Sequence, residues 1–283
     1  MPRSGKSVPV TEEGKLALRR RNRTRRLWVY GGLAAGLYAA YCWQPYEYDF
    51  IPRRIPSPNP PVDPNKAHLF APGTKILVVT AHPDDSEFYI GGTLTQLGKT
   101  AKVWQVVCTD GDKGYYGPFA NPSENRTVRQ AEGRAALKTW GGQDVYFLSH
   151  PDGRLRVNTE LVDQLVGVMK KVQPDYVLSF DGDYPPRMSH QDHRRAGDAA
   201  LLAAKQCKIP RWCLLFSSLA PNFFIDITDT WDQKKALLAI HKSQFNGEKL
   251  EKVANMVAST AEDEGEKGGF TLGEGFRCVR IRP

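Results

Sequence analysis

From residue 74 onward, short apolar runs rich in β-branched residues alternate with longer stretches of helical pattern. Such runs predict buried strands, and regular alternation with helices favours a parallel sheet joined by right-handed crossovers. The chain is therefore predicted to fold as an α/β, Rossmann-like parallel sheet flanked by helices. The predicted strands are residues 75–80, 103–108, 145–148 and 176–180, and the predicted helices are residues 90–98, 123–140, 158–172 and 191–205.

The C-terminal part of the sequence is less regular. Two short apolar runs, residues 213–217 and 223–227, precede a predicted helix over 230–244. A late strand is expected at 276–281. Residues 259–269 are rich in Gly and Glu, and we expect a mobile loop there.

Charge is distributed very unevenly along the chain. The net charge is +8, which for a protein of 283 residues would suggest nucleic-acid binding if it were spread over the surface. Residues 1–26, however, hold nine Lys and Arg against two Glu, a net of +7, so the rest of the chain is nearly neutral. This argues against nucleic acid as a partner and defines 1–26 as a basic tail.

The basic tail runs directly into residues 27–43, which carry no charge. Trp28 and Trp43 lie near the two ends, as interfacial aromatics do in membrane-spanning helices. We predict a transmembrane signal anchor, at the short limit of length. A cleaved signal or transit peptide is the alternative, but no small-x-small cleavage site follows.

The anchor would make the protein a membrane protein. The positive charge before the span favours a cytosolic N-terminus and a lumenal catalytic domain. Asn125 begins an N-glycosylation sequon that would be usable in that orientation. A proline-rich linker over 44–73 would separate the anchor from a catalytic domain over 74–283. The five cysteines form no CxxC pair and imply no disulfide framework.

A cluster of ionisable residues follows the first predicted strand. His82, Asp84, Asp85 and Glu87 lie within six residues of one another. Ligands bind beyond the carboxyl ends of strands in open α/β sheets, so the cluster lies where the fold would place its chemistry. Several carboxylates crowded together repel one another unless a cation neutralises them, which indicates a metal site.

Further polar clusters follow the other predicted strands. They are residues 109–112, 150–153, 181–183 and 189–193. Because the carboxyl ends of parallel strands meet at one edge of a sheet, these clusters are predicted to form one shared site.

The spacing of the histidines suggests hydrolytic metal chemistry. His82 and Asp85 are three residues apart, as are His190 and His193. Two His and one carboxylate with an open position are typical of a catalytic zinc site. An adjacent carboxylate such as Asp84 is available to accept a proton from water.

These residues resemble the motifs of the LmbE/PIG-L-like de-N-acetylases. Residues Ala81–Glu87, followed by Gly91–Leu94, resemble the opening motif of that family. Residues His190–His193 resemble its second motif. A third, later motif resembles Ala239–Gln244, and Arg129-x-x-Glu132 also matches. The resemblance covers about residues 74–245 and implies removal of acetate from an N-acetylglucosaminyl group.

The resemblance also implies roles for individual residues. Zn²⁺, or another divalent metal, would be held by His82, Asp85 and His193. Asp84 would be the general base, and His190 the oxyanion stabiliser or acid, with Asp192 as its partner. The remaining implied residues are Arg129 and Asp152 as sugar contacts, His241 as either a substrate contact or a packing residue, and Glu87 as support for the site. Arg129 could equally be a helix-surface charge, and Asp152 a turn former.

One branch of this family acts on N-acetylglucosaminyl-phosphatidylinositol in GPI-anchor biosynthesis at the endoplasmic reticulum and is anchored by an N-terminal span, so the anchor here makes a lipid-linked substrate attractive. That enzyme works on the cytosolic face, whereas the charge before the span here favours the lumenal side. The Asp-Asp-x-Glu form of the first motif and Asp192 in the second are closer to the bacterial-like branch, so a deacetylase of another glycoside or small amide is the alternative.

A nucleotide-binding Rossmann protein would need a glycine-rich turn where His-Pro-Asp-Asp stands. A non-catalytic membrane-anchored sugar-binding protein would be expected to have lost a ligand or the base, and none is missing.

Overall fold

The computed structural model describes residues 60–114, 121–184 and 190–282, and within them a seven-stranded sheet carries the fold. The strand order is β3-β2-β1-β4-β5-β7-β6, so β1 lies inside the sheet between β2 and β4. The strands are β1 Lys75–Thr80, β2 Lys102–Thr109, β3 Asp144–His150, β4 Tyr176–Phe180, β5 Trp212–Phe216, β6 Phe223–Asp226 and β7 Gly273–Arg280. The four predicted strands up to residue 180 are all present.

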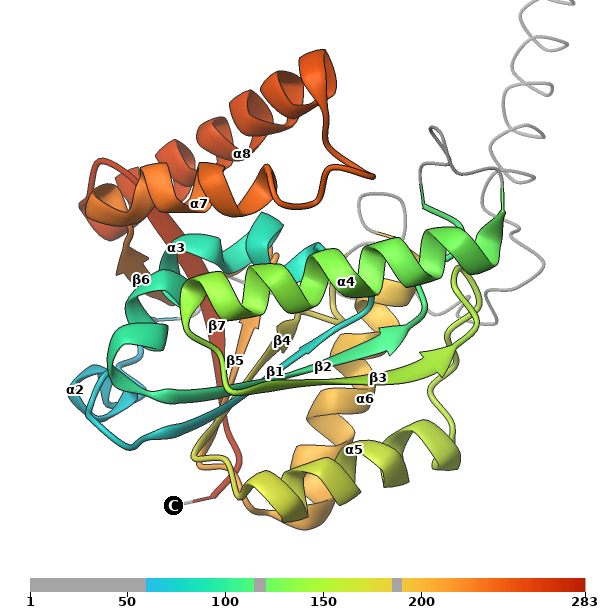
Figure 1. Cartoon of the computed structure of the whole chain (residues 1–283). Coiled ribbons are helices and arrows are strands. Elements are labelled where there is room, and N and C mark those ends of the chain that lie inside the picture. Colours follow the sequence, from blue (N-terminus) through green and yellow to red (C-terminus); the bar gives the residue numbers. More distant parts are fainter. Residues whose placement is uncertain (1–59, 115–120, 185–189, 283) are drawn as a thin grey trace, which may run out of the picture. The chain divides into compact units, whose positions relative to one another are not determined.

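Helices cover both faces of the sheet (Figure 1). Helices α3, α4, α7 and α8 lie on one face, and α5 and α6 lie on the other. The helices are α2 Lys66–Leu69, α3 Asp85–Thr100, α4 Pro122–Trp140, α5 Thr159–Val172, α6 Gln191–Cys207, α7 Trp231–Leu238 and α8 Gly247–Gly268, with a 3-10 turn at Thr228–Thr230. Strands β1 and β4 are buried almost throughout, because helices cover them from both sides.

The prediction of a parallel sheet is correct only for part of it. Strands β3, β2, β1, β4 and β5 pair in parallel, but β7 is antiparallel to both β5 and β6. A parallel neighbour requires a crossover of a dozen or more residues, and only residues 217–222 separate β5 from β6. Strand β7 returns from the far end of the chain and fills the position between them. The sheet is therefore mixed.

Two further predictions for the C-terminal part were wrong. Residues 259–269 are not a loop, because α8 runs through them to Gly268. Val257, Ala261 and Gly265 recur every fourth residue and are the buried face of this helix, a pattern that the Gly and Glu content obscured. The helix expected over 230–244 ends at Leu238, and the following turn carries residues of the site.

Two predictions bear on membrane association: the N-terminal anchor and the glycosylation sequon at Asn125. Residues 1–43, with the basic tail and the proposed anchor, lie outside the described residues. Within the described ranges, no helix has the length and apolar character needed to cross a bilayer. The sequon prediction is corrected: Asn125 is fully buried in α4 and its Nδ2 donates to the carbonyl of Asp112 at 3.0 Å. The folded domain therefore does not present this sequon.

Candidate metal-dependent active site

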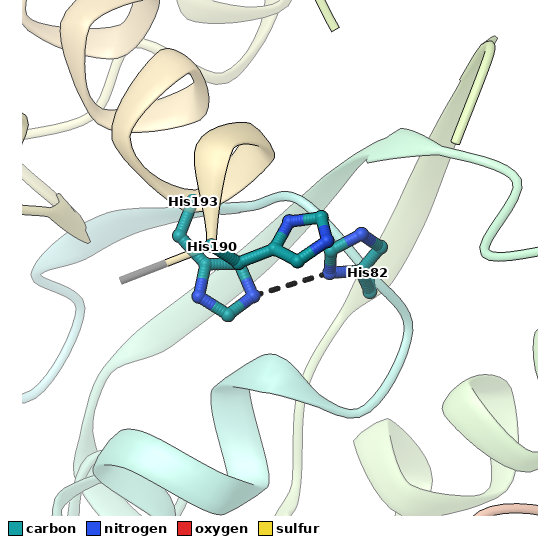
Figure 2. Close-up of side chains that lie close together, drawn as sticks. All are labelled: His82, His190 and His193. Carbon is teal, nitrogen blue, oxygen red and sulfur yellow. Dashed lines mark hydrogen bonds between the residues drawn. The ribbon is translucent and has the colours of Figure 1, made fainter. Parts of the chain in front are cut away.

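The carboxyl ends of β1, β3 and β4 bring three of the predicted clusters together. His82 lies in the turn after β1, Asp152 follows β3, and the segment from 190 to 193 opens α6 beyond β4. Figure 2 shows His82 facing His190 and His193, which extend from α6. The three ring centroids lie 5.0 to 5.2 Å apart. Residues separated by more than a hundred positions thus form one imidazole cluster.

The other two clusters do not join this site through their carboxylates. Asp110 pairs with Arg126 at 3.0 Å, although the neighbouring carbonyl of Gly111 accepts from Arg129. Asp181 is bound by Arg277, whose Nε donates to Oδ2 at 2.7 Å. The prediction of a single shared site is therefore correct for three strand ends only.

The three predicted metal ligands lie side by side. His82 Nδ1 lies 3.2 Å from His193 Nε2, Asp85 Oδ1 lies 3.1 Å from His193 Nε2, and Asp85 Oδ2 lies 3.5 Å from His82 Nδ1. Two ligand atoms at a usual zinc bond length and a tetrahedral angle would be about 3.4 Å apart. These separations are compatible with a divalent cation between His82, His193 and Asp85, whose two oxygens each face one of the rings. The imidazoles of His82, His190 and His193 form a second group that could hold a metal ion, since their nitrogen atoms lie within 4.8 Å of one another.

The electrostatics of the cluster favour positive charge. Burial opposes charging of His82, but Asp85 and the bonds to Asp152 and Asp192 raise its pKa well above the usual value. Burial likewise opposes ionisation of Asp85, yet the charges of His193 and His82 hold its pKa well below the usual range. Asp85 Oδ2 also accepts from the backbone N–H groups of Ala81 and His82, at 3.0 and 2.7 Å. An ionised carboxylate at this position is an anionic ligand ready for a metal ion.

Each of the two imidazoles proposed to bind the metal, His82 and His193, is held by a further contact. His82 Nε2 lies 3.1 Å from Asp152 Oδ1, which leaves Nδ1 directed at His193. The ring of His193 stacks on Phe180, with 4.3 Å between centroids and 5° between planes. Metal-binding imidazoles usually donate their other N–H to a carboxylate, which fixes the tautomer and the ring orientation.

The contact with His82 places Asp152 differently from the sequence-based expectation. Asp152 is buried; burial raises its pKa, but the hydrogen bond and charge of His82 bring it down to about 2. Its other oxygen accepts from the N–H of Lys113 at 2.8 Å. Both carboxylate oxygens are thus engaged, although Asp152 also lines the pocket. Its geometry fits orientation of His82.

Asp84 is held beside the metal cluster by Arg129. The guanidinium Nη2 donates to Asp84 Oδ1 at 2.9 Å, and Nη1 binds the carbonyl of Gly111. Arg129 is buried rather than a helix-surface charge, and its Nε has no hydrogen-bond partner among the described residues. Asp84 therefore keeps a carboxylate that can accept a proton while Arg129 fixes its position.

The pairing expected between His190 and Asp192 takes another form. The backbone N–H of Asp192 donates to His190 Nδ1 at 3.2 Å. The Asp192 carboxylate accepts instead from the N–H groups of Gly153 and Leu155, at 2.6 and 3.1 Å. Burial, followed by the nearby His82 and His193, lowers the pKa of His190. The carboxylate of Asp192 thus orders the loop that carries Asp152.

Glu87 and His241 form a buried pair behind the pocket. His241 Nε2 lies 3.2 Å from Glu87 Oε2, and Trp140 Nε1 donates to Glu87 Oε1 at 2.8 Å. Burial opposes protonation of His241, but Glu87 raises its pKa. His241 is 1% exposed and is not part of the pocket wall, so of its two expected roles the geometry supports packing. Glu87 anchors the turn after α7 to α3.

Several residues of the pocket were not found by the sequence motifs. The pocket has a volume of ≈ 360 Å³ and is walled partly by Phe88, Tyr89, Phe245 and Lys113. Phe245 is positioned by the motif residue Glu132, which accepts from Ser243 N and Oγ. Nothing in the spacing of isolated aromatic residues marks them as wall positions, because the wall is assembled from three separate elements.

Residues 77–204 match the family model described as PIG-L, GlcNAc-PI de-N-acetylase. The chain carries a PIG-L/LmbE family domain. Within the matched region lie all three members of the proposed metal site, whereas the α7–α8 turn and β7 lie beyond it.

Relatives of this PIG-L/LmbE domain include sugar deacetylases. The diacetylchitobiose deacetylase of Thermococcus kodakarensis is 26% identical over 222 residues, covering 72% of this chain and 83% of the relative. The 1D-myo-inositol 2-acetamido-2-deoxy-alpha-D-glucopyranoside deacetylase of Corynebacterium diphtheriae is 27% identical over 167 residues, covering 49% and 55%.

Solved structures agree on the fold. The N,N'-diacetylchitobiose deacetylase of Pyrococcus horikoshii, at 29% identity, aligns with a TM-score of 0.69 over 74% of this chain and 84% of that chain. A 4-carboxy-2-hydroxymuconate hydratase of Pseudomonas putida, at 23% identity, has a TM-score of 0.62 over 74% and 98%. Since one fold accommodates both reactions, the PIG-L/LmbE fold alone does not assign the chemistry, and the site residues must carry that argument.

Proposed function

We propose that the domain hydrolyses the acetamide of an N-acetylglucosaminyl conjugate and releases acetate. The observation that carries this proposal is the meeting of three ligand atoms, from His82, Asp85 and His193, with the carboxylate of Asp84 in one pocket. The deacetylases among the relatives act on N-acetylated sugars, which supports the same reaction class here.

The chain's own residues suffice for the proton transfers. A divalent cation, zinc by its donor set, would supply Lewis acidity and a more acidic water when bound. Asp84 accepts the proton of the water whose oxygen attacks the acetamide carbon. Arg129 holds Asp84 Oδ1 in place. As the C–N bond breaks, the departing amine takes the proton that Asp84 received from the water.

His190 is the residue proposed to face the acetamide from the opposite side. It lines the pocket together with Asp84. With Nδ1 accepting from the backbone, the neutral ring carries its proton on Nε2, which can donate to the developing oxyanion. The low pKa of His190 favours this neutral donor in the unliganded chain.

For the rest of the substrate we propose a lipid-linked N-acetylglucosaminyl-phosphatidylinositol. Two features support it. Lys113 lines the pocket, and Lys249 Nζ lies 5.9 Å from the centroid of the Phe245 ring, so two cations lie at or beside the pocket and would attract a phosphate. Phe88 and Phe245, with 6.3 Å between ring centroids, give an apolar surface beside them. The uncharged segment 27–43 would place the domain at a membrane, proposed to be that of the endoplasmic reticulum with the domain lumenal.

The alternative substrate is a soluble N-acetylated glycoside, because the relatives include enzymes named for chitobiose and for an inositol glycoside. Acetate release should be measured on the full chain with the inositol lipid, the lipid-free inositol glycoside and diacetylchitobiose. Faster turnover of the lipid supports the proposed substrate, whereas faster turnover of chitobiose favours the soluble class. No acetate from any of them, with metal supplied, would contradict the proposed activity.

A further inference from the structure

Helix α3 is broken just after its first turn. Ile90 has φ −131° and ψ 25°, which is outside the helical region and separates a short turn ending at Tyr89 from a longer helix beginning at Gly91. Such a break leaves the last carbonyls of the first part and the first N–H groups of the second without partners in the helix. In a buried helix these groups require partners from elsewhere.

Two buried charged side chains supply those partners. Glu274 of β7 accepts from the N–H groups of Gly92 and Thr93, at 3.0 and 2.8 Å. Lys234 of α7 donates to the carbonyl of Tyr89 at 3.1 Å and pairs with Glu274 at 2.6 Å. Each side chain is matched to the helix end it contacts, since anions favour helix N-termini and cations favour C-termini.

The Gly-Gly dipeptide of the opening motif permits this arrangement. A Cβ on Gly91 would lie 3.1 Å from Lys234 Cγ, and a Cβ on Gly92 would lie 2.7 Å from Ile227. Only glycine, which lacks a Cβ, allows α7 and the segment that carries Ile227 to approach α3 so closely. The dipeptide is therefore explained by the packing of α7 and of the segment before it onto the break.

Stability alone is a weak reason for such a pair. Lys234 and Glu274 are each 2% exposed, and isolating two charges from water commonly offsets what their attraction contributes. What distinguishes the pair is its position between two helix segments of different direction. The first turn carries Asp85, and its last residue Tyr89 places Oη 3.5 Å from His193 Nδ1.

We propose that Lys234 and Glu274 are positioning residues for the metal site: by capping the two ends of the break, they hold the first turn of α3 where Asp85 meets His82 and His193. The inference rests on the proposed metal-dependent function. It adds two residues from α7 and β7, both outside the matched family region.

The experiment makes the same substitution at the buried Glu274 and at the half-buried Glu264. Glu274→Gln removes a carboxylate oxygen from the break. Glu264→Gln is the control, because Glu264 Oε2 accepts from Gly275 N on β7 at 2.7 Å. Zinc affinity is measured on the full chain in detergent by competition with a chromophoric chelator, at a temperature where every variant is folded. We expect roughly a 10- to 100-fold weaker affinity for Glu274→Gln, the scale seen for residues that support metal ligands. Glu264→Gln should bind zinc like the wild type.

A second variant covers the case in which an unpaired lysine unfolds the protein. Lys234→Met/Glu274→Leu removes both charges together and should fold, yet it lacks the caps. Hydrogen exchange of the peptide covering residues 85–93 should become faster in it, while the strands remain unchanged. kcat should fall with less than about a twofold change in KM, because the substrate contacts remain.

The outcomes separate the two proposals. Wild-type zinc affinity in both Glu274 variants, or equal loss in Glu264→Gln, would overturn the positioning role and leave the proposed function intact. A wild-type chain that binds no divalent metal would overturn both. Unchanged exchange at 85–93 in the double variant would overturn the capping role directly.

Discussion

His82 Nδ1 lies 3.2 Å from His193 Nε2, although 111 positions separate the two residues in the chain. The contact exists because β1 and β4 are neighbours in the sheet and their following turns meet at one edge. Two nitrogen atoms this close, with Asp85 beside both, make a site whose metal dependence can be tested residue by residue.

Removing a ligand should abolish metal binding, while removing the base should not. His193→Ala and Asp85→Ala are expected to lose the bound metal, because three protein ligands are the usual minimum for a catalytic zinc. Asp84→Asn should retain metal and lose at least ~100-fold in kcat, the usual scale of a general base. Elemental analysis and acetate release measure the two effects. Full activity of Asp84→Asn would contradict the mechanism.

Asp152 provides a test of orientation against substrate contact. Asp152→Asn keeps the shape of the side chain but weakens its bond to His82 Nε2. If Asp152 orients His82, zinc affinity should fall about 10- to 100-fold in the absence of substrate. If it contacts the sugar instead, affinity stays constant and only KM rises. Titration of the apoprotein with zinc distinguishes the two.

Lys249 tests the proposed anionic aglycone. Lys249→Met should raise KM for the phosphate-bearing lipid by about 5- to 10-fold, roughly one interaction of 1 kcal/mol, and leave KM for diacetylchitobiose unchanged. The matched control is Lys252→Met on the same helix, since Lys252 is exposed and pairs with Glu248 at 3.6 Å. An equal rise in KM for both substrates would show that Lys249 does not contact the phosphate of the aglycone.

Glu264 should make stability depend on pH. Burial raises its pKa to about 7. Because this exceeds the usual value, the folded state holds a proton that the unfolded state has already released, and stability falls as pH rises between about 4.5 and 7. The penalty above that window is at most about 3 kcal/mol. Glu264→Gln should therefore gain several degrees in Tm over the wild type at pH 8 and little at pH 4.5, by calorimetry. A gain independent of pH would contradict the assignment.

The sequence predicted a set of metal ligands but not the contacts that support them. The family resemblance named His82, Asp85 and His193 as metal ligands, and the structure places these three residues side by side. The sequence did not show that Asp152 would hold His82, or that the carboxylate of Asp192 would order the 153–155 loop instead of His190. Those contacts depend on side-chain direction across loops, which spacing along the chain does not encode. The Lys234–Glu274 ion pair could not be predicted from the sequence either, because the two residues are 40 positions apart and neither belongs to a motif.

By itself, the sequence predicted the first four strands and their parallel arrangement, and it placed a proposed metal site at their carboxyl ends. Apolar periodicity and residue type are local properties, and the parallel connection rules leave few arrangements for them. Only the tertiary structure decided that β7 inserts antiparallel between β5 and β6 and that α3 breaks at Ile90. Each of these outcomes depends on segments that meet after the chain has folded: β7 carries Glu274 to the break, and α7 carries Lys234. The proposed ligands could therefore be named from the sequence, whereas their placement depends on the packing of α7 and β7, which come late in the chain.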